Sequence, residues 1–221
     1  MTSINTMDRR TFIAGAAGLS ALALAGCTST PRVTQPPAPQ FDPFYVNMYG
    51  PLPNEKFPVP AVDLRYLKPE YYRQVVDDPT GERPGTIVVD TSSRYLYLVR
   101  EGRQAIRYGA GIGRAGFEWS GRGYIQYKRE WPTWTPPAAM IEREPHLEEW
   151  RHGQPGGLDN PLGARALYIF ENGRDTIYRV HGSGEAWTIG EAVSSGCVRL
   201  LHQDVIDLYD RVSQGAPILV V

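Results

Sequence analysis

From Gly85 onward, the apolar residues of the chain gather in short runs that are typical of β-strands. Residues 86–90 are rich in β-branched side chains, and residues 95–99 and 105–108 are two further apolar runs. The two runs flank a short polar segment that contains Gly102, and a glycine between two such runs predicts a β-hairpin.

The same arrangement recurs later in the chain. Residues 166–170 and 176–180 are apolar runs separated by a segment that contains Asn172 and Gly173. Asn-Gly is the strongest short signal for a tight hairpin turn, so a second hairpin is predicted. Between the hairpins, residues 109–165 are rich in Gly, Pro and Trp with little periodicity, which is typical of a functional loop region.

Helical periodicity is confined to short stretches. Residues 66–76 place apolar side chains on one side of a predicted helix, and residues 204–212 have apolar spacing near 3.6. Residues 218–221 read as a closing strand. We therefore expect one mainly β domain over residues 61–221, with a few short helices.

The N-terminus has the pattern of an export signal. Arg9 and Arg10 precede an apolar stretch of 15 residues, 12–26, which is short for a membrane span of about 20 residues. The paired arginines resemble a twin-arginine signal, although Asp8 departs from the usual pattern. An apolar helix of the core is the alternative interpretation.

Residues 24–27, Leu-Ala-Gly-Cys, resemble a bacterial lipobox, in which Cys27 would carry a lipid that anchors the protein to a membrane. The alternative is an ordinary signal peptide with an incidental cysteine. Nine of the 33 residues in 28–60 are proline, which predicts an extended tether. Phe41, Phe44, Tyr45 and Tyr49 are many aromatic residues for a linker and indicate that part of this stretch packs on the domain. The expected division is thus a signal peptide (1–27), a tether (28–60) and a domain (61–221), in a periplasmic lipoprotein.

Composition narrows the function classes. Apolar residues make up 42% of the 221 residues and the net charge is −1, so the chain is globular and shows no basic surface for nucleic acid.

The second cysteine of the chain, Cys197, follows His181 by 16 residues. A thiolate is a strong nucleophile, and an imidazole can take the thiol proton and return it to a leaving amine. This pair predicts a cysteine enzyme.

Neighbouring residues suit the same chemistry. Gly196 allows a tight turn, and the amides of Gly196 and Cys197 are candidate donors to an oxyanion. Arg199 adds positive charge that favours thiolate or binds a carboxylate. Each residue also has a structural interpretation: a buried core cysteine, a hydrogen-bonding His181, or an arginine in a salt bridge.

The combination of His181-Gly182 with Ser194-x-Gly196-Cys197-Val198-Arg199 resembles the signature of the L,D-transpeptidase catalytic domain (YkuD type). The likeness covers roughly residues 85–221, including 85–99, 131–137 and 160–163. Two departures stand out: Ser195 occupies a position where histidine is common, and His202 lies where asparagine is common, as a substitute helix cap, a substrate contact or a surface residue.

The resemblance implies a β-sandwich or barrel-like catalytic fold and a role in peptidoglycan biosynthesis and cell shape. Family members attack the bond between the third residue of a stem peptide and a terminal D-alanine. Carried over by position, Cys197 is the nucleophile, His181 is the base, and Ser194 helps to order the site. The acceptor is another stem peptide, a D-amino acid or a wall-linked protein.

Two other function classes remain open: a hydrolase that uses water as acceptor, and a lipoprotein that binds the wall without catalysis. Gly111 to Gly116 match G-x-G-x-x-G, but no helix follows, so nucleotide binding is not expected. His146 and His152 among glutamates fit no familiar metal spacing, so neither a metal nor a cofactor is expected. Trp131, Trp134 and Trp150 line a groove or pack in the core.

Overall fold

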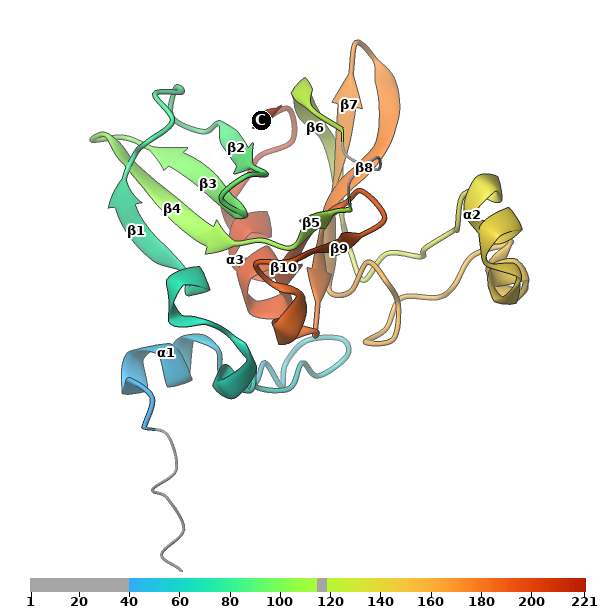
Figure 1. Ribbon diagram of the computed structural model, residues 1–221, viewed down its shortest axis with the longest axis horizontal. Helices are drawn as coiled ribbons and strands as arrows, with labels where there is room; N and C mark the ends of the chain where they lie inside the picture. Colours follow the sequence, from blue (N-terminus) through green and yellow to red (C-terminus); the bar gives the residue numbers. More distant parts are fainter. Residues whose placement is uncertain (1–39, 115–118) are drawn as a thin grey trace, which may run out of the picture. The chain divides into compact units, whose positions relative to one another are not determined.

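The computed structural model describes residues 40–114 and 119–221, in which nine strands form one sheet and two short strands pair separately (Figure 1). The strands are β1 Gln74–Asp77, β2 Ile87–Asp90, β3 Tyr95–Arg100, β4 Gln104–Gly109, β5 Ile112–Gly113, β6 Gly121–Glu130, β7 Arg165–Glu171, β8 Arg174–Ser183, β9 Ala192–Ser194, β10 Val198–Leu201 and β11 Pro217–Val220. The α-helices are α1 Pro43–Met48, α2 Ala138–Arg143 and α3 His202–Arg211. Short 3-10 helices cover η1 Leu64–Tyr66, η2 Pro69–Tyr71, η3 Pro145–Trp150 and η4 Ala186–Thr188.

Both predicted hairpins are confirmed, and the fold is mainly β as expected. The large sheet has the order β1-β4-β3-β2-β11-β6-β7-β8-β10, and β5 pairs with β9 outside it. At the turn between β7 and β8, Asn172 has φ 49° and Gly173 has φ 78°. Two successive positive φ angles are what a two-residue hairpin turn requires.

The predicted helix over residues 66–76 is wrong. This stretch forms the end of η1, at Tyr66, then η2 and strand β1. Pro69 has no N–H to donate and disfavours the α conformation at Lys68, which is extended with ψ 136°. The chain therefore cannot run as one helix through this point.

Strand β6 was not expected within the region 109–165. Its sequence, with Gly121 and Gly123 and several charged residues, lacks the alternation of a half-buried strand. It forms because it pairs with β11 on one side and β7 on the other. Tertiary pairing decides this element rather than local propensity.

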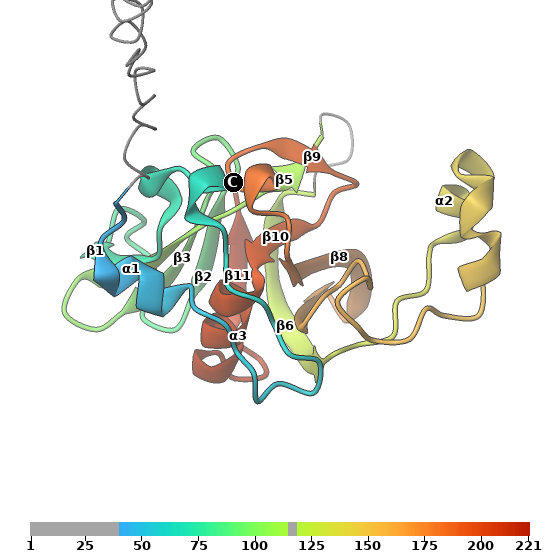
Figure 2. The same cartoon turned by 90° about the horizontal axis from the view of Figure 1, so that it is seen from below.

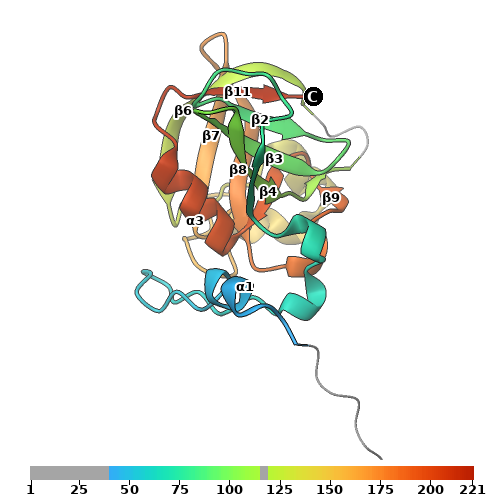
Figure 3. The same cartoon turned by 90° about the vertical axis from the view of Figure 1, so that its left-hand side faces the viewer.

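One apolar core joins the two halves of the large sheet. Its members come from β2, β3, β4, β6, β7, β8, β10 and β11, together with Val205, Leu208 and Val212 of α3 and its C-terminal end. Figure 3 shows α3 running alongside the strands that it covers. The helix predicted over residues 204–212 and the closing strand are confirmed as α3 and β11.

Residues 41–60 pack on the domain and belong to the same compact unit as the residues that follow them, up to Val221. Tyr49, only 1% exposed, donates a hydrogen bond from its hydroxyl to Asp204 of α3 (3.3 Å) and accepts one from the Arg73 N–H (2.7 Å). The folded unit thus includes residues that the sequence division places in the tether. The expected signal peptide, Cys27 and residues 28–39 lie outside the described residues.

Two local features matter for the site. Residues 131–164, which we name the insertion, connect β6 to β7 and carry α2 and η3, which Figures 1 and 2 both draw away from the sheet. The β7–β8 pairing also contains a bulge, because its register shifts between Tyr168 and Phe170 and Ile177 has φ 69°.

The helices within residues 40–114 and 119–221 are all too short or too polar to cross a membrane.

Candidate active site

The parallel pairing of β8 and β10 brings the two sequence-predicted residues together. Val180 is opposite Val198 and His181 is opposite Arg199. Cys197 precedes β10 by one residue, so the same register places it beside Arg179 at the end of the strand pair. His181 and Cys197, which are 16 residues apart in the sequence, therefore lie at the same end of the strand pair.

Ser194 holds the turn that presents Cys197. Its buried hydroxyl donates a hydrogen bond to the Cys197 carbonyl (2.6 Å) and accepts one from the Gly196 N–H (3.2 Å). Strand β5 passes close behind, since a Cβ on Gly113 would lie 2.8 Å from the Gly196 Cα. Glycine at 113 therefore allows the two backbones to pack directly.

His181 is buried and has one available tautomer. Its Nδ1 lies 3.0 Å from the Gly182 carbonyl oxygen, which can only accept, so Nδ1 carries the proton and Nε2 keeps its lone pair. Burial lowers the pKa of His181 to about 4, and the charges of Arg199 and His202 act in the same direction. The imidazole is neutral at pH 7 and is able to accept a proton.

Cys197 is a half-buried free cysteine. Burial raises the pKa of its thiol, while a backbone hydrogen bond with Arg179 and the guanidinium groups of Arg179 and Arg199 oppose that rise. The resting state is thus a neutral thiol and a neutral imidazole in the same pocket, and the proton moves only when the sulfur attacks.

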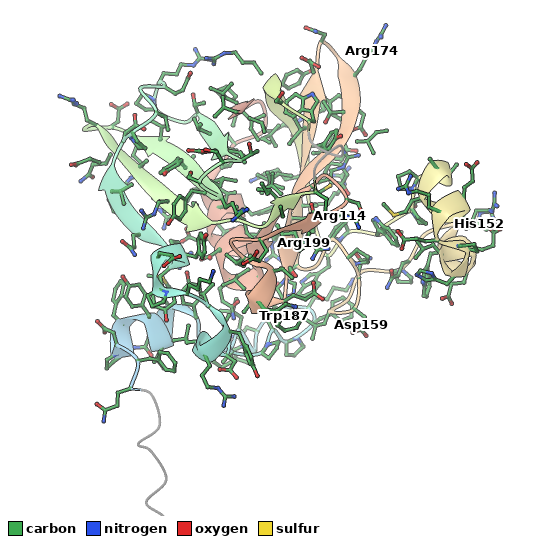
Figure 4. All side chains as sticks on the ribbon, in the orientation of Figure 1. Arg114, His152, Asp159, Arg174, Trp187 and Arg199 are labelled. Atoms are coloured by element: carbon green, nitrogen blue, oxygen red, sulfur yellow. The ribbon has the colours of Figure 1, made fainter. Side chains whose placement is uncertain are left out.

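Two arginines lie on the walls around the thiol. Arg199, which Figure 4 labels on β10, pairs with Glu185 through its Nη1 (2.9 Å), so its salt-bridge interpretation is the one observed. Arg179 binds Asp175 with both terminal nitrogens (2.7 and 2.8 Å), and its guanidinium carbon lies 4.4 Å from the Tyr168 ring centroid. Sequence reasoning missed Arg179. Its position two residues before His181 on an alternating strand was the available signal.

A pocket of about 670 Å³ contains both candidate catalytic residues. The sheet side contributes Tyr168, Ile177, Arg179, His181, Ser194, Ser195, Cys197 and Arg199. The insertion contributes Thr133, Trp134, Thr135, Pro137, Met140, Glu144, His146, Leu147, Trp150, Gln154, Asp159, Pro161 and Leu162. Figure 4 labels His152 at the far end of the insertion, beside α2 and η3, and Asp159 nearer the sheet. Trp134 and Trp150 line the pocket, whereas Trp131 is buried where the insertion begins.

His202 is buried at 3% exposure and does not lie on the surface. It is the first residue of α3, and its Nδ1 accepts a long hydrogen bond from the Ala164 N–H (3.4 Å). Gly163 has φ 61°, and a Cβ there would meet His202 Cε1 at 2.4 Å and Gly182 O at 2.6 Å. His202 thus packs behind the His181–Gly182 strand end and outside the pocket.

No ligand site was expected from the sequence at the glycine-rich motif or at His146 and His152. The structure shows where several of these residues lie. Gly111 and Gly113 lie beside the nucleophile turn, because β5 pairs with β9, while residues 115–116 lie outside the described ones. His146 lies 4.0 Å from Glu144 on the insertion. Among the residues that the structure describes, no three His, Cys, Asp or Glu side chains are grouped so as to hold a metal ion.

Comparison with known proteins identifies a family. Residues 84–220 match the family model "L,D-transpeptidase catalytic domain" (YkuD). The probable L,D-transpeptidase ErfK/SrfK of Escherichia coli K12 is 34% identical over 147 residues, 65% of this chain and 46% of that protein. The probable L,D-transpeptidase YbiS of the same strain is 35% identical over 147 residues, 62% of this chain and 44% of that protein.

Solved structures are also similar. A Brucella melitensis protein described as a probable carnitine operon oxidoreductase is 45% identical, with 72% of this chain and 99% of that chain covered and a TM-score of 0.49. L,D-transpeptidase 3 of Mycobacterium tuberculosis, solved with a faropenem-derived adduct, is 20% identical over 61% of this chain and 59% of its own, with a TM-score of 0.42. The chain spans about half the length of the curated relatives it matches.

Proposed function

Because the chain belongs to the L,D-transpeptidase catalytic domain family, we propose that it is a peptidoglycan L,D-transpeptidase, a cysteine acyltransferase that joins stem peptides. The observation that carries the proposal is the presence of Cys197 and His181 in one pocket of about 670 Å³. That volume is in the range of pockets that enclose a substrate. Aromatic and proline side chains of the insertion give it the apolar lining that an extended peptide needs.

In the first half-reaction, the Cys197 thiol attacks the carbonyl carbon of the third stem residue. Its proton passes to His181 Nε2, which is unprotonated because Nδ1 donates to the Gly182 carbonyl. The tetrahedral intermediate collapses to a thioester, and the departing D-alanine nitrogen takes the proton from His181. The bond formed is carbon–sulfur and the bond broken is the peptide carbon–nitrogen bond.

In the second half-reaction, an amine attacks the thioester carbonyl and gives its proton to His181. The Cys197 sulfur leaves and is reprotonated, which restores the free enzyme. Water in place of the amine would make the same site a carboxypeptidase or a cross-link amidase. The two outcomes share every step up to the thioester.

The Cys197 N–H is the backbone donor that we assign to the oxyanion. The sequence suggested the amides of Gly196 and Cys197 together, but the Gly196 N–H already donates to Ser194 Oγ. A preorganised donor at the point where negative charge develops is a large contributor to acyl transfer. Ser194 therefore acts by fixing the orientation of the Cys197 peptide.

We predict that Ser194→Ala lowers the rate of Cys197 acylation by about 10- to 100-fold, because a small misplacement of the nucleophile is costly. The Ala variant loses both hydrogen bonds that fix the turn. Ser194→Thr keeps the hydroxyl and serves as the matched control. Acylation by a carbapenem, followed by intact-protein mass spectrometry, measures the effect. Equal rates for the Ala and Thr variants would contradict this role.

Arg179 is predicted to favour the Cys197 thiolate. Its charge lowers the pKa of the thiol, and so does its backbone hydrogen bond, which a side-chain substitution leaves in place. Because the charge is lost, Arg179→Met should move the pH profile of Cys197 alkylation by iodoacetamide to higher pH. Arg179→Lys keeps the charge and should shift the profile less. A profile that is unchanged in the Met variant would show that the guanidinium has no electrostatic effect on the thiol.

The activity itself is tested with disaccharide-tetrapeptide as substrate and mass spectrometry of the products. Formation of a cross-linked dimer that has lost one D-alanine would support transpeptidation. Tripeptide alone would favour the hydrolase. Absence of product and of any acyl adduct on Cys197, in folded protein, would favour the lipoprotein that binds the wall without catalysis.

We further propose that the protein is exported to the periplasm and anchored to a membrane by a lipid on Cys27. The support is the sequence alone: Arg9-Arg10, the apolar stretch 12–26 and the lipobox-like residues before Cys27. Export agrees with the proposed substrate, because assembled peptidoglycan lies outside the cytoplasm. Metabolic labelling with an alkyne fatty acid, compared between the wild type and Cys27→Ser, tests the anchor.

A further inference from the structure

Glu55 lies where the N-terminal segment meets the base of the insertion. It belongs to a small loop closed by two hydrogen bonds between the backbones of Leu52 and Val59 (2.9 and 3.1 Å). This loop precedes residues 84–220, the part of the chain that matches the family model. The contacts of Glu55 therefore add something that the family domain itself does not contain.

The Glu55 carboxylate is fully engaged by two residues. Trp131 Nε1 donates to Oε2 (2.9 Å), and Arg165 donates from Nη1 to Oε2 (2.9 Å) and from Nη2 to Oε1 (2.8 Å). The Arg165 side chain is only 7% exposed. Burial alone would raise the pKa of Glu55, but the hydrogen bonds from Arg165 and Trp131 bring it below its ordinary value.

Trp131 and Arg165 mark the two ends of the insertion. Trp131 is the first residue of the insertion, and Arg165 follows its last residue. The backbone N–H of Trp131 donates a hydrogen bond to the Ala164 carbonyl (2.8 Å), where the two ends meet. Phe57, from the same N-terminal loop, packs on the Trp131 ring with centroids 5.0 Å apart. One carboxylate thus contacts the chain as it enters the insertion and as it leaves.

Above this base, the insertion is closed by a second set of contacts. The Asn160 side-chain amide donates to the carbonyls of Pro132, Gln154 and Pro155 (3.0–3.1 Å). Trp134 and Gln154 exchange backbone hydrogen bonds (3.0 and 2.7 Å). These contacts join the outgoing and returning parts of the insertion near its base, and the insertion supplies many of the residues that line the pocket with Cys197.

We infer that Glu55 is a positioning residue, whose carboxylate holds both ends of the insertion and so fixes the pocket wall opposite Cys197. The part of this inference that concerns turnover rests on the proposed function. The part that concerns the insertion does not, because backbone protection can be measured in the enzyme without substrate.

The test compares Glu55→Gln with Glu82→Gln in the full-length protein. Glu82 also binds an arginine, Arg122, but at a more exposed site away from the pocket. Hydrogen exchange should accelerate by about 10-fold or more at the amides of Trp134 and Gln154 in Glu55→Gln, with the β7–β8 amides unchanged. The Glu82→Gln protein should exchange like the wild type at all of these amides.

Two further readouts separate positioning from general damage. Iodoacetamide is small and does not need the insertion, so its rate of Cys197 alkylation should stay within about twofold of wild type in Glu55→Gln. Turnover of disaccharide-tetrapeptide should fall by about 10-fold, mainly through a higher KM. Trp131→Phe removes one of the three hydrogen bonds and should give a smaller change of the same kind.

Unchanged protection of the insertion in Glu55→Gln would overturn the inference, and so would equal acceleration in the insertion and the sheet. If neither the variant nor the wild type turns over peptide while the exchange pattern is as expected, the proposed function fails and the positioning role stands.

Discussion

Replacing Cys197 by Ala is expected to abolish formation of any acyl-enzyme and to reduce turnover of disaccharide-tetrapeptide by about 10³-fold or more, because no other group supplies a sulfur nucleophile at that position. Cys197 is the cysteine of the pocket, and the neighbouring hydroxyl groups of Ser194 and Ser195 are much weaker nucleophiles than a thiolate. The Ser194 hydroxyl is already committed to two hydrogen bonds. Intact-protein mass spectrometry after incubation with substrate or a carbapenem measures the adduct.

The Ala variant must also be shown to fold. The side chain is half-buried just before β10, so its loss should leave the thermal midpoint within a few degrees of the wild type. Cys197→Ser keeps the shape and provides the matched comparison. Turnover that persists in both variants would mean that a different residue carries the chemistry.

Replacing His181 by Gln is expected to lower turnover by about 10²- to 10⁴-fold, the usual contribution of a positioned general base. The wild-type rate should have an acid limb as well. Protonated imidazole cannot accept the thiol proton, and burial lowers the pKa of His181 to about 4. Turnover in the wild type should therefore fall as the pH drops through about 4, rather than near the ordinary histidine value.

The pH dependence of alkylation gives an independent check on this pair. If the resting state is a neutral thiol and a neutral imidazole, alkylation of Cys197 should rise steadily with pH through neutrality, as the thiol ionises. A thiolate–imidazolium pair would instead give a rate plateau extending to acid pH. Observation of that plateau would refute the neutral resting state, and a wild-type acid limb near pH 6.5 would refute the lowered pKa of His181.

Local patterns predicted the strands β2, β3, β4, β7, β8 and β11 and the pair of reactive residues, but not β1, β5, β6, β9 and β10. The β3–β4 and β7–β8 hairpins, α3 and β11 all follow from alternation, turn residues and helical spacing. Cys197 and His181 were available from the motif because their chemistry depends on residue type. Their proximity, however, needs the parallel pairing of β8 with β10, which no local pattern contains.

What local reasoning missed depends on contacts distant in sequence. Strand β6 has a poor strand pattern and exists because of its two neighbours. Arg179 was overlooked because a pocket-facing arginine resembles a surface one until the bulge and the Tyr168 ring are known. Glu55 belongs to a proline-rich stretch whose composition is that of a tether, although its carboxylate is held by Trp131 and Arg165.

Because β8 contains a bulge, the number of residues in that strand determines whether Asp175 reaches Arg179. Residues four apart on a regular strand are separated by about 13 Å, too far for an ion pair, yet Asp175 and Arg179 are joined by two hydrogen bonds. The additional residues around Ile177 shorten that span and return Asp175 to the arginine. Removing one residue there would also turn the preceding side chains to the opposite face. Homologous chains of different length at this point would have to hold the arginine by other means.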